Sequence, residues 1–173
     1  MIFVPQRGLH DCATACCSMV LRYFGRLHDY QSIDKLLRPR KEKKTSILQM
    51  MACLRNYSLE AYGMKGETSS ILAKNEIAIY HMKSGKSHHF VVLKAQKRRG
   101  FIKIYDPRFL WVTLRTTRYF RKYWTGYYLK VNGQKSTNKI PIELKIPFFM
   151  KAFLIGGIWV TFVLILLQAL MQV

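Results

Sequence analysis

Acidic residues are scarce in this chain, which has 9 Asp and Glu against 29 Lys and Arg among its 173 residues and a formal net charge of +20. Such an excess must meet anions, so the composition indicates nucleic acid, acidic lipid headgroups or an acidic peptide as a partner. Aromatic and basic residues interleave over 115–124, but no recognised nucleic-acid module is present, so we do not expect nucleic acid. The short basic runs 41–44 and 97–99 read as solvated loops, with anionic lipid as the alternative contact.

Cysteine is also sparse, and its spacing matches no zinc-ligand pattern. The cysteines are Cys12, Cys16, Cys17 and Cys53. Their low density argues against a disulfide framework, so free thiols in a reducing compartment are expected. No Walker motif occurs, which predicts no ATP site, and we expect no metal or other cofactor. A signal peptide is not expected, because the apolar stretch before Pro5 is too short.

The C-terminal segment differs from the rest, because residues 152–173 contain no charged side chain. About 20 apolar residues span a bilayer core, so we expect a transmembrane helix over 148–173, with a buried or oligomer-forming helix as the alternative. The lysines that precede it are Lys139, Lys145 and Lys151. By the positive-inside rule they predict a single-pass protein of the inner or plasma membrane with a cytoplasmic N-terminal domain. Residues 132–147 are predicted to be a linker.

Helical periodicity marks the N-terminal third of the chain. Asp11 is a plausible N-cap for a helix over 12–24 that stops at Gly25. Asp29 can cap a second helix, and 46–49 has the spacing of a capping box that opens a third.

Short strands are expected after these helices, where Val, Ile, Tyr and Phe are frequent and Gly, Lys or Pro bound each run. The expected strands are 59–64, 76–82, 89–95, 101–105, 111–114 and 126–131. A short helix is expected over 117–124, and 97–100 reads as a hairpin turn. Helices followed by strands predict an α+β fold with a largely antiparallel sheet, in one domain over 1–131.

A candidate nucleophile stands at the start of the first predicted helix. There the helix dipole and free N–H groups favour the thiolate form of Cys12. The alternative is that Cys12 is a small core residue, as we expect for Cys16, Cys17 and Cys53 on the apolar helix faces. Gln6 offers an amide donor for a developing oxyanion, beside the backbone N–H of Cys12.

A histidine and an aspartate complete the set of candidate site residues. His89 begins an apolar strand, where its side chain can face a cleft, and the neighbouring His88 points to the opposite face. If 89–95 and 101–106 pair antiparallel, position 89 lies roughly opposite Asp106, which could orient the imidazole and stabilise its charged form. Taken alone, the histidine could be an ordinary surface or core residue and the Asp-Pro pair an ordinary turn.

Together these residues resemble the double-glycine leader peptidases, the papain-like cysteine peptidase domains of bacteriocin-processing, peptidase-containing ABC transporters. The matching residues are Gln6, Asp11, Cys12, Ala13, Cys16, Arg22-Tyr-Phe-Gly25, His89-Phe-Val-Val-Leu93, Asp106-Pro107 and Trp124-Thr-Gly126. The resemblance covers roughly residues 1–131. The chain departs from the family pattern at Ala13, where glycine is common, and in carrying no ATPase motif.

The resemblance implies a Cys-His-Asp peptidase with Cys12 as nucleophile, His89 as general base and acid, and Asp106 as orienter. It implies Gln6 as the oxyanion donor. The implied reaction is cleavage after a Gly-Gly or Gly-Ala pair that ends the leader of a bacteriocin or signalling-peptide precursor, coupled to export by an ABC transporter. Since no ATPase motif is present, we expect either a separate exporter subunit as partner or a truncated transporter. Acidic leaders would be attracted to a domain of this charge, mainly through the association rate.

Two other functions remain open at this point. One is a non-catalytic leader-docking subunit of a split peptide exporter; such relatives tend to lack the cysteine, which is present here. The other is a basic protein of the membrane surface, which requires the order Gln, Cys, His and Asp to be a coincidence.

Overall fold

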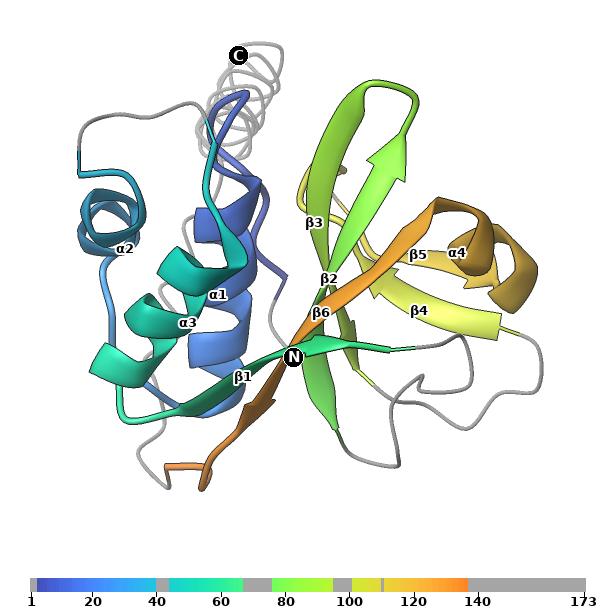
Figure 1. The fold of residues 1–173 in the computed structure, drawn as a ribbon. Helices are drawn as coiled ribbons and strands as arrows, with labels where there is room; N and C mark the ends of the chain where they lie inside the picture. The colour runs from blue at the N-terminus through green and yellow to red at the C-terminus, as the bar shows by residue number, and fades with distance from the viewer. Residues whose placement is uncertain (1–2, 40–43, 67–75, 95–100, 110, 137–173) are drawn as a thin grey trace, which may run out of the picture. The chain divides into compact units, whose positions relative to one another are not determined.

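The computed structural model describes residues 3–39, 44–66, 76–94, 101–109 and 111–136, which all lie in one compact unit, Met1–Ile140 (Figure 1). The elements in chain order are α1 (Cys12–Tyr23), α2 (Tyr30–Leu37), α3 (Ile47–Asn56), β1 (Glu60–Lys65), β2 (Ile77–Ser84), β3 (Ser87–Lys94), β4 (Phe101–Tyr105), β5 (Thr113–Thr116), α4 (Thr117–Tyr123) and β6 (Trp124–Asn132).

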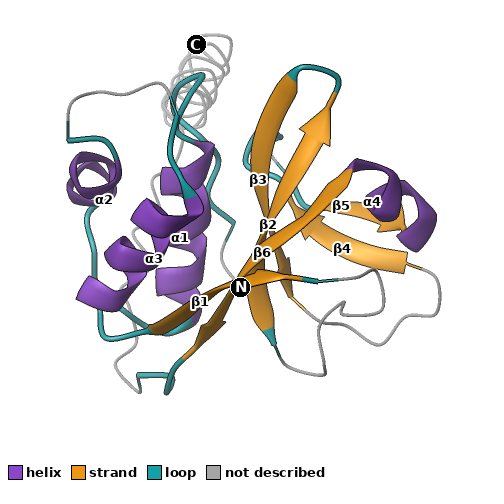
Figure 2. Ribbon diagram, viewed as in Figure 1, coloured by secondary structure: helices purple, strands orange, loops and turns teal. Residues whose placement is uncertain are grey.

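Helices and strands occupy separate layers of this unit. The strands form one six-stranded sheet in the order β1-β6-β2-β3-β4-β5, and every neighbouring pair is antiparallel. Helices α1, α2 and α3 gather on one side of the sheet, and α4 lies on the other side (Figures 1 and 2). The predicted α+β fold with an antiparallel sheet is therefore confirmed.

Most of the predicted helix signals act as the sequence indicates. The Asp29 carboxylate accepts from the backbone N–H of Ser32 at 2.9 Å and caps α2. Ser46 and Gln49 form a complete capping box at the start of α3. Gly25 ends α1 in the left-handed region, with φ of 70°, which a residue without Cβ adopts at little cost.

The strand boundaries differ from the predictions at two places that matter for the site. Strand β3 begins at Ser87, so His89 lies within the strand and not at its first position. The reason is a two-residue turn at Gly85–Lys86, in which Gly85 has a φ of 59° and joins β2 directly to β3. Strand β5 begins at Thr113, later than predicted, because its residues pair with β4.

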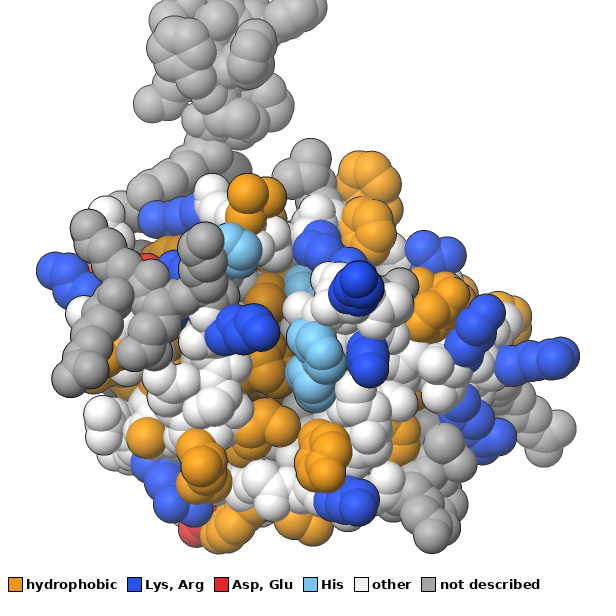
Figure 3. All heavy atoms as spheres, turned by 45° about the horizontal axis from the view of Figure 1, so that its top comes forward, with side chains coloured by type: hydrophobic (Ala, Val, Ile, Leu, Met, Phe, Trp, Pro, Cys, Tyr) orange, Lys and Arg blue, Asp and Glu red, His pale blue; other side chains and the backbone are white. Residues whose placement is uncertain are grey.

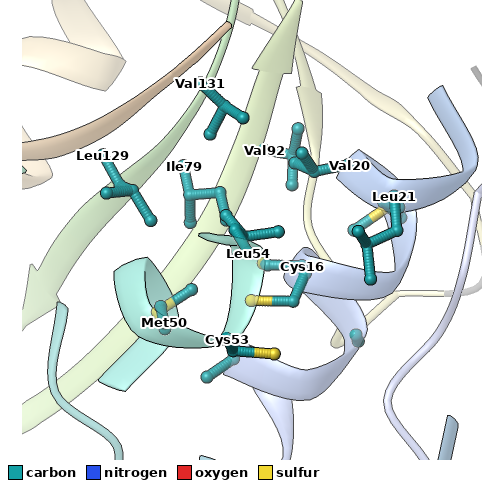
Figure 4. Close-up of a cluster of buried hydrophobic side chains, with 14 of the residues drawn as sticks. Cys16, Val20, Leu21, Met50, Cys53, Leu54, Ile79, Val92, Leu129 and Val131 are labelled. Carbon is teal, nitrogen blue, oxygen red and sulfur yellow. The ribbon is translucent and has the colours of Figure 1, made fainter. Parts of the chain in front are cut away.

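The main core lies between the helices and the sheet. Cys16 and Cys53 pack there beside Leu54 from α3 and Val92 from β3, all less than 3% exposed (Figure 4). A second cluster, on the α4 side, centres on Tyr80, whose ring stacks on Tyr128 at 5.2 Å between centroids. Each fully buried aliphatic side chain contributes about 1.5–3 kcal/mol to folding. The helices are therefore firmly anchored to one face of the sheet.

Several predictions fall outside the described residues. These are the transmembrane helix over 148–173, the hairpin turn 97–100 and most of the linker 132–147. The part of the linker that is described continues from β6, and the Ser136 N–H donates to the carbonyl oxygen of Phe24 at 2.9 Å. No helix within the described ranges has the length and apolar character needed to cross a membrane.

Candidate active site

Cys12 is the first residue of α1, and its thiol is half-buried while the other cysteines are buried. Cys16 and Cys17 are 0% exposed and Cys53 is 2% exposed. Burial raises the pKa of Cys16 and Cys17 well above that of a free thiol, so both stay protonated and unreactive. The prediction that Cys16, Cys17 and Cys53 are core residues therefore matches their observed burial.

Asp11 holds the N-cap position of α1, but its side chain does not cap the helix, contrary to the prediction. The carboxylate turns back and accepts from the backbone N–H of Arg7 at 2.9 Å and of Gly8 at 3.0 Å. The Tyr30 hydroxyl donates to the same group at 2.7 Å. Asp11 therefore fixes the loop that leads from Gln6 to the helix. The three hydrogen bonds that its buried carboxylate accepts stabilise the fold more than a single cap bond would.

We expect Asp11→Ala to lower the free energy of unfolding by about 2–4 kcal/mol, because two backbone N–H groups and a buried hydroxyl lose their acceptor. The matched control is Asp29→Ala, which removes an exposed cap of α2 and should lower the free energy of unfolding by much less. Urea denaturation of the two variants measures both values. Equal losses would show that the Asp11 contacts add little beyond a helix cap.

His89 and Asp106 meet as the sequence predicts. His89 is 6% exposed and Asp106 is 5% exposed, and His89 Nε2 donates to Asp106 Oδ1 at 2.7 Å. The predicted register was wrong by two residues: Val92 lies opposite Tyr105, so 106 continues opposite 91 and not 89. A shift of two keeps a side chain on the same face of a strand, so the contact forms as a diagonal pair.

Arg108 is a site residue that the sequence reading missed. Its backbone N–H and Nε donate to Asp106 Oδ1 at 3.0 and 3.2 Å, and Nη2 donates to Oδ2 at 2.8 Å. Asp106 is thus held between an imidazole and a guanidinium. The only available signal was a basic residue two positions after the aspartate across a turn-forming Pro107, a spacing that lets a side chain fold back.

These contacts set the charge states of the site. Burial opposes a charged Cys12, but hydrogen bonding and charge attraction from His89, with the N–H groups of Phe90 and Ala13, lower the pKa of the thiol overall. Burial likewise opposes a charged His89, but Asp106 and Cys12 raise the pKa of its imidazole. The pKa of Asp106 lies far below its usual value, since hydrogen bonds from His89 and Arg108 outweigh burial. The arrangement favours a thiolate beside an imidazolium.

A cavity of about 640 Å³ opens over Cys12. It is lined by Gln6, Leu9, His10, Cys12, Ala13, Lys44, Thr45, His81, Lys86, Ser87, His88, His89, Phe90 and Arg108. Figure 3 shows histidine side chains in the middle of a face of the molecule, with Lys and Arg side chains around them. The basic side chains among the lining residues, Lys44, Lys86 and Arg108, would attract a negatively charged ligand.

Gln6 lines this cavity with Cys12, as predicted, and its backbone N–H donates to the carbonyl oxygen of Pro107 at 2.9 Å. The N-terminal loop is thereby attached to the turn that carries Asp106. The side-chain Oε1 of Gln6 is buried and has no hydrogen-bond partner in the part of the chain that the structure describes. No neighbour there fixes that oxygen, so the amide can turn its NH₂ group toward an oxygen held above Cys12.

Comparison with solved structures identifies the fold. The chain is similar to a double glycine motif protease from an AMS/PCAT transporter, crystallised with the leader peptide, at 24% identity and a TM-score of 0.66 over 75% of this chain and 89% of that one. It is similar to the peptidase domain of Streptococcus ComA, a bi-functional ABC transporter of a quorum sensing pathway, at 19% identity and 0.64 over 76% and 97%.

A third likeness is to the N-terminal peptidase C39 like domain of the toxin secretion ATP-binding protein from Vibrio parahaemolyticus, at 17% identity and a TM-score of 0.61 over 73% of this chain and 100% of that one. No curated protein matches the chain. At these identities the structural likeness establishes the fold, which is that of peptidase domains of ABC transporters. The model of the peptidase C39 family matches residues 1–136, and the chain therefore belongs to the peptidase C39 family.

Proposed function

We propose that this chain is a cysteine endopeptidase that removes leader peptides ending in a Gly-Gly type pair. The observation that carries the proposal is that Cys12 hydrogen-bonds to His89, which in turn hydrogen-bonds to Asp106. Cys12 also lines the cavity. A non-catalytic docking surface would not require a thiol with a lowered pKa next to an oriented imidazole.

In this proposal the Cys12 thiolate attacks the carbonyl carbon of the last leader residue and forms a tetrahedral oxyanion. The His89 imidazolium then donates its proton to the departing amine, the C–N bond breaks, and a thioester remains on Cys12. Water, deprotonated by neutral His89, adds to the thioester, and the released thiolate reforms the ion pair. Asp106 holds the imidazole in one tautomer throughout and stays ionised.

Two backbone-anchored groups are proposed to stabilise the oxyanion. The Cys12 N–H at the start of α1 has no partner within the helix, and the Gln6 amide reaches the same cavity. A hydrogen-bond donor to an oxyanion typically contributes about 10²–10³-fold to the rate. The attachment of the Gln6 backbone to Pro107 supports this role, because it holds the donor relative to the Asp106 turn.

The substrate class and cellular setting extend the same proposal. We propose the precursor of a secreted bacteriocin or signalling peptide as substrate and a separate ABC exporter subunit as partner. A transmembrane helix over 148–173 would hold the domain at the cytoplasmic face of the inner or plasma membrane, where an exporter takes up its cargo. The leader peptide and the transporters named for the similar structures support this setting.

Selective alkylation tests the state of the proposed nucleophile. We expect iodoacetamide to modify Cys12 within minutes at neutral pH and to leave the buried Cys16, Cys17 and Cys53 unmodified, because a half-buried thiol of lowered pKa reacts as the thiolate. Peptide mass spectrometry locates the modification. Prior incubation with a peptide that carries a Gly-Gly leader end should slow the reaction. Modification spread evenly over the four cysteines would contradict the proposed active thiol.

The pH dependence of cleavage should report the ion pair and the influence of Arg108 on it. Cleavage should rise as pH increases through the lowered pKa of Cys12 and fall as pH increases through the raised pKa of His89. Arg108→Gln removes a positive charge that stabilises ionised Asp106 and ionised Cys12. The pKa values of both Cys12 and His89 then rise, so both limbs of the profile should move to higher pH.

The control is Arg118→Gln, which removes the same charge from an exposed position on α4 outside the cavity. The profile of kcat/KM against pH should be unchanged in this variant. Identical profiles for Arg108→Gln and the parent would show that Arg108 does not influence the ion pair.

A further inference from the structure

His81 and His88 form a contact that the proposed mechanism does not use. They come from adjacent strands, β2 and β3, and are offset by two residues from direct opposition, since Lys83 is the residue opposite His88. Their rings are nearly parallel, at 10°, with centroids 5.1 Å apart. His88 Nδ1 and His81 Nε2 face each other at 3.2 Å. Both residues line the cavity over Cys12.

We propose that His81 and His88 form a two-histidine site for a transition-metal ion such as Zn²⁺ at the edge of this cavity. The spacing of the two ring nitrogens is the first argument. Two nitrogens that each lie about 2.0–2.1 Å from one ion, at angles between about 90° and tetrahedral, are about 2.9–3.4 Å apart. The 3.2 Å between Nδ1 of His88 and Nε2 of His81 falls inside that range, so the ion needs little strand movement. His88 is exposed, and its ring can rotate to aim the nitrogen.

The hydrogen bonds of Thr125 are the second argument, because they fix the protonation of His81. The Thr125 hydroxyl donates to the backbone carbonyl of His81 at 3.0 Å, which leaves its oxygen to accept from His81 Nδ1–H at 3.0 Å. Nε2 of His81 then carries the lone pair and faces His88. Metal-bound histidines ordinarily have such a partner on the second nitrogen, which fixes the tautomer and orients the ring.

The donor atoms and charges nearby select the kind of ion. Imidazole nitrogens suit Zn²⁺, Cu²⁺ or Ni²⁺, whereas Mg²⁺ and Ca²⁺ require oxygen ligands. No group of three or more His, Cys, Asp and Glu side chains that could hold a metal occurs among the described residues, so water would complete the coordination. Lys86 and Arg108 line the same cavity, and their positive charges repel cations. A cation that binds here therefore needs direct bonds to the imidazole nitrogens.

A metal ion at this site would occupy part of the cavity that Cys12 and His89 also line. If the cavity receives the leader, as proposed above, the ion competes with the peptide and inhibits cleavage. That consequence depends on the proposed function, but metal binding itself does not. The binding experiment is therefore made with the full chain carrying Cys12→Ala, which removes the reactive thiol as a zinc ligand and needs no substrate.

Isothermal titration of this Cys12→Ala chain with Zn²⁺ should show one site. Adding His88→Ala should abolish the binding heat, since a single imidazole remains. Adding Thr125→Val, which changes no ligand, should weaken binding about tenfold or more. Adding His10→Ala should leave the affinity unchanged, because His10 is exposed in the same cavity and, among the described residues, forms neither a hydrogen bond nor a ring contact with His81 or His88.

Circular dichroism establishes that each variant is folded, and Thr125→Val tests the site independently if His88→Ala is destabilised. Absence of zinc binding to the Cys12→Ala chain, or undiminished binding after His88→Ala, would overturn the proposal. So would loss of binding in His10→Ala, since the ion would then lie elsewhere in the cavity. None of these results bears on cleavage, which the parent chain tests separately.

Discussion

Cys12→Ala is expected to reduce cleavage of a peptide with a Gly-Gly leader end by roughly 10³-fold or more, to a rate close to that without enzyme. The substitution removes the only cysteine thiol that is not fully buried, and this thiol is the one that hydrogen-bonds to His89. Chromatographic separation of leader and product at fixed substrate concentration measures the effect. Binding of the leader should persist, because the basic residues lining the cavity are unchanged.

The matched control is Cys16→Ala, the same change one helical turn further along α1. Cys16 is 0% exposed and packs in the main core, so the variant should lose some stability yet cleave at a rate within a few-fold of the parent. Full activity in Cys12→Ala would exclude the proposed nucleophile. Leader binding without cleavage in the parent chain would instead favour the non-catalytic docking function.

His89→Asn is expected to lower kcat/KM by about 10³-fold, because both the attack and the departure of the amine need the imidazole. Asparagine retains a hydrogen-bonding group toward Asp106 but cannot exchange a proton near neutral pH. Its effect should therefore appear mainly in kcat. The labelling rate of Cys12 should fall as well, since the pKa of the thiol rises when the imidazolium is lost.

His88→Asn is the neighbouring control, with the same substitution one residue earlier on β3. Its side chain contacts His81 and not Asp106, so we expect a change of less than about tenfold. Equal losses in the two variants would mean that the histidines act on the strand structure and not on the chemistry. A normal Cys12 labelling rate in His89→Asn would contradict the ion pair.

The sequence alone was sufficient for most of the fold because its signals are local. The capping box at Ser46 and the glycine stop at Gly25 depend on a few neighbouring residues, and both appear in the structure. Strand boundaries were less predictable, since β5 is fixed by its partner β4 and not by its own composition. The start of β3 was missed because the turn at Gly85–Lys86 is short and resembles a loop in composition.

In the candidate site too, features set by a regular pattern along the chain could be predicted, and features set by individual side-chain contacts could not. His89 and Asp106 were paired from an approximate register, and an error of two residues was tolerated because strand faces repeat every two residues. The role of Asp11 was misassigned, since a capping position does not reveal that Tyr30 and the preceding loop compete for its carboxylate. Arg108 was overlooked because basic residues are abundant in this chain and none stands out by composition.

The hydrogen bond from the Gln6 N–H to the carbonyl of Pro107 has a consequence for folding during synthesis on the ribosome. Chains emerge N-terminus first, so the helix bearing Cys12 leaves the exit tunnel long before Asp106 and Pro107. Until those residues arrive, the sulfur has neither its oriented imidazole nor a fixed amide nearby. In a half-synthesised chain the proposed site is therefore incomplete, and it forms only when Gln6 and Pro107, which are far apart in the sequence, come together.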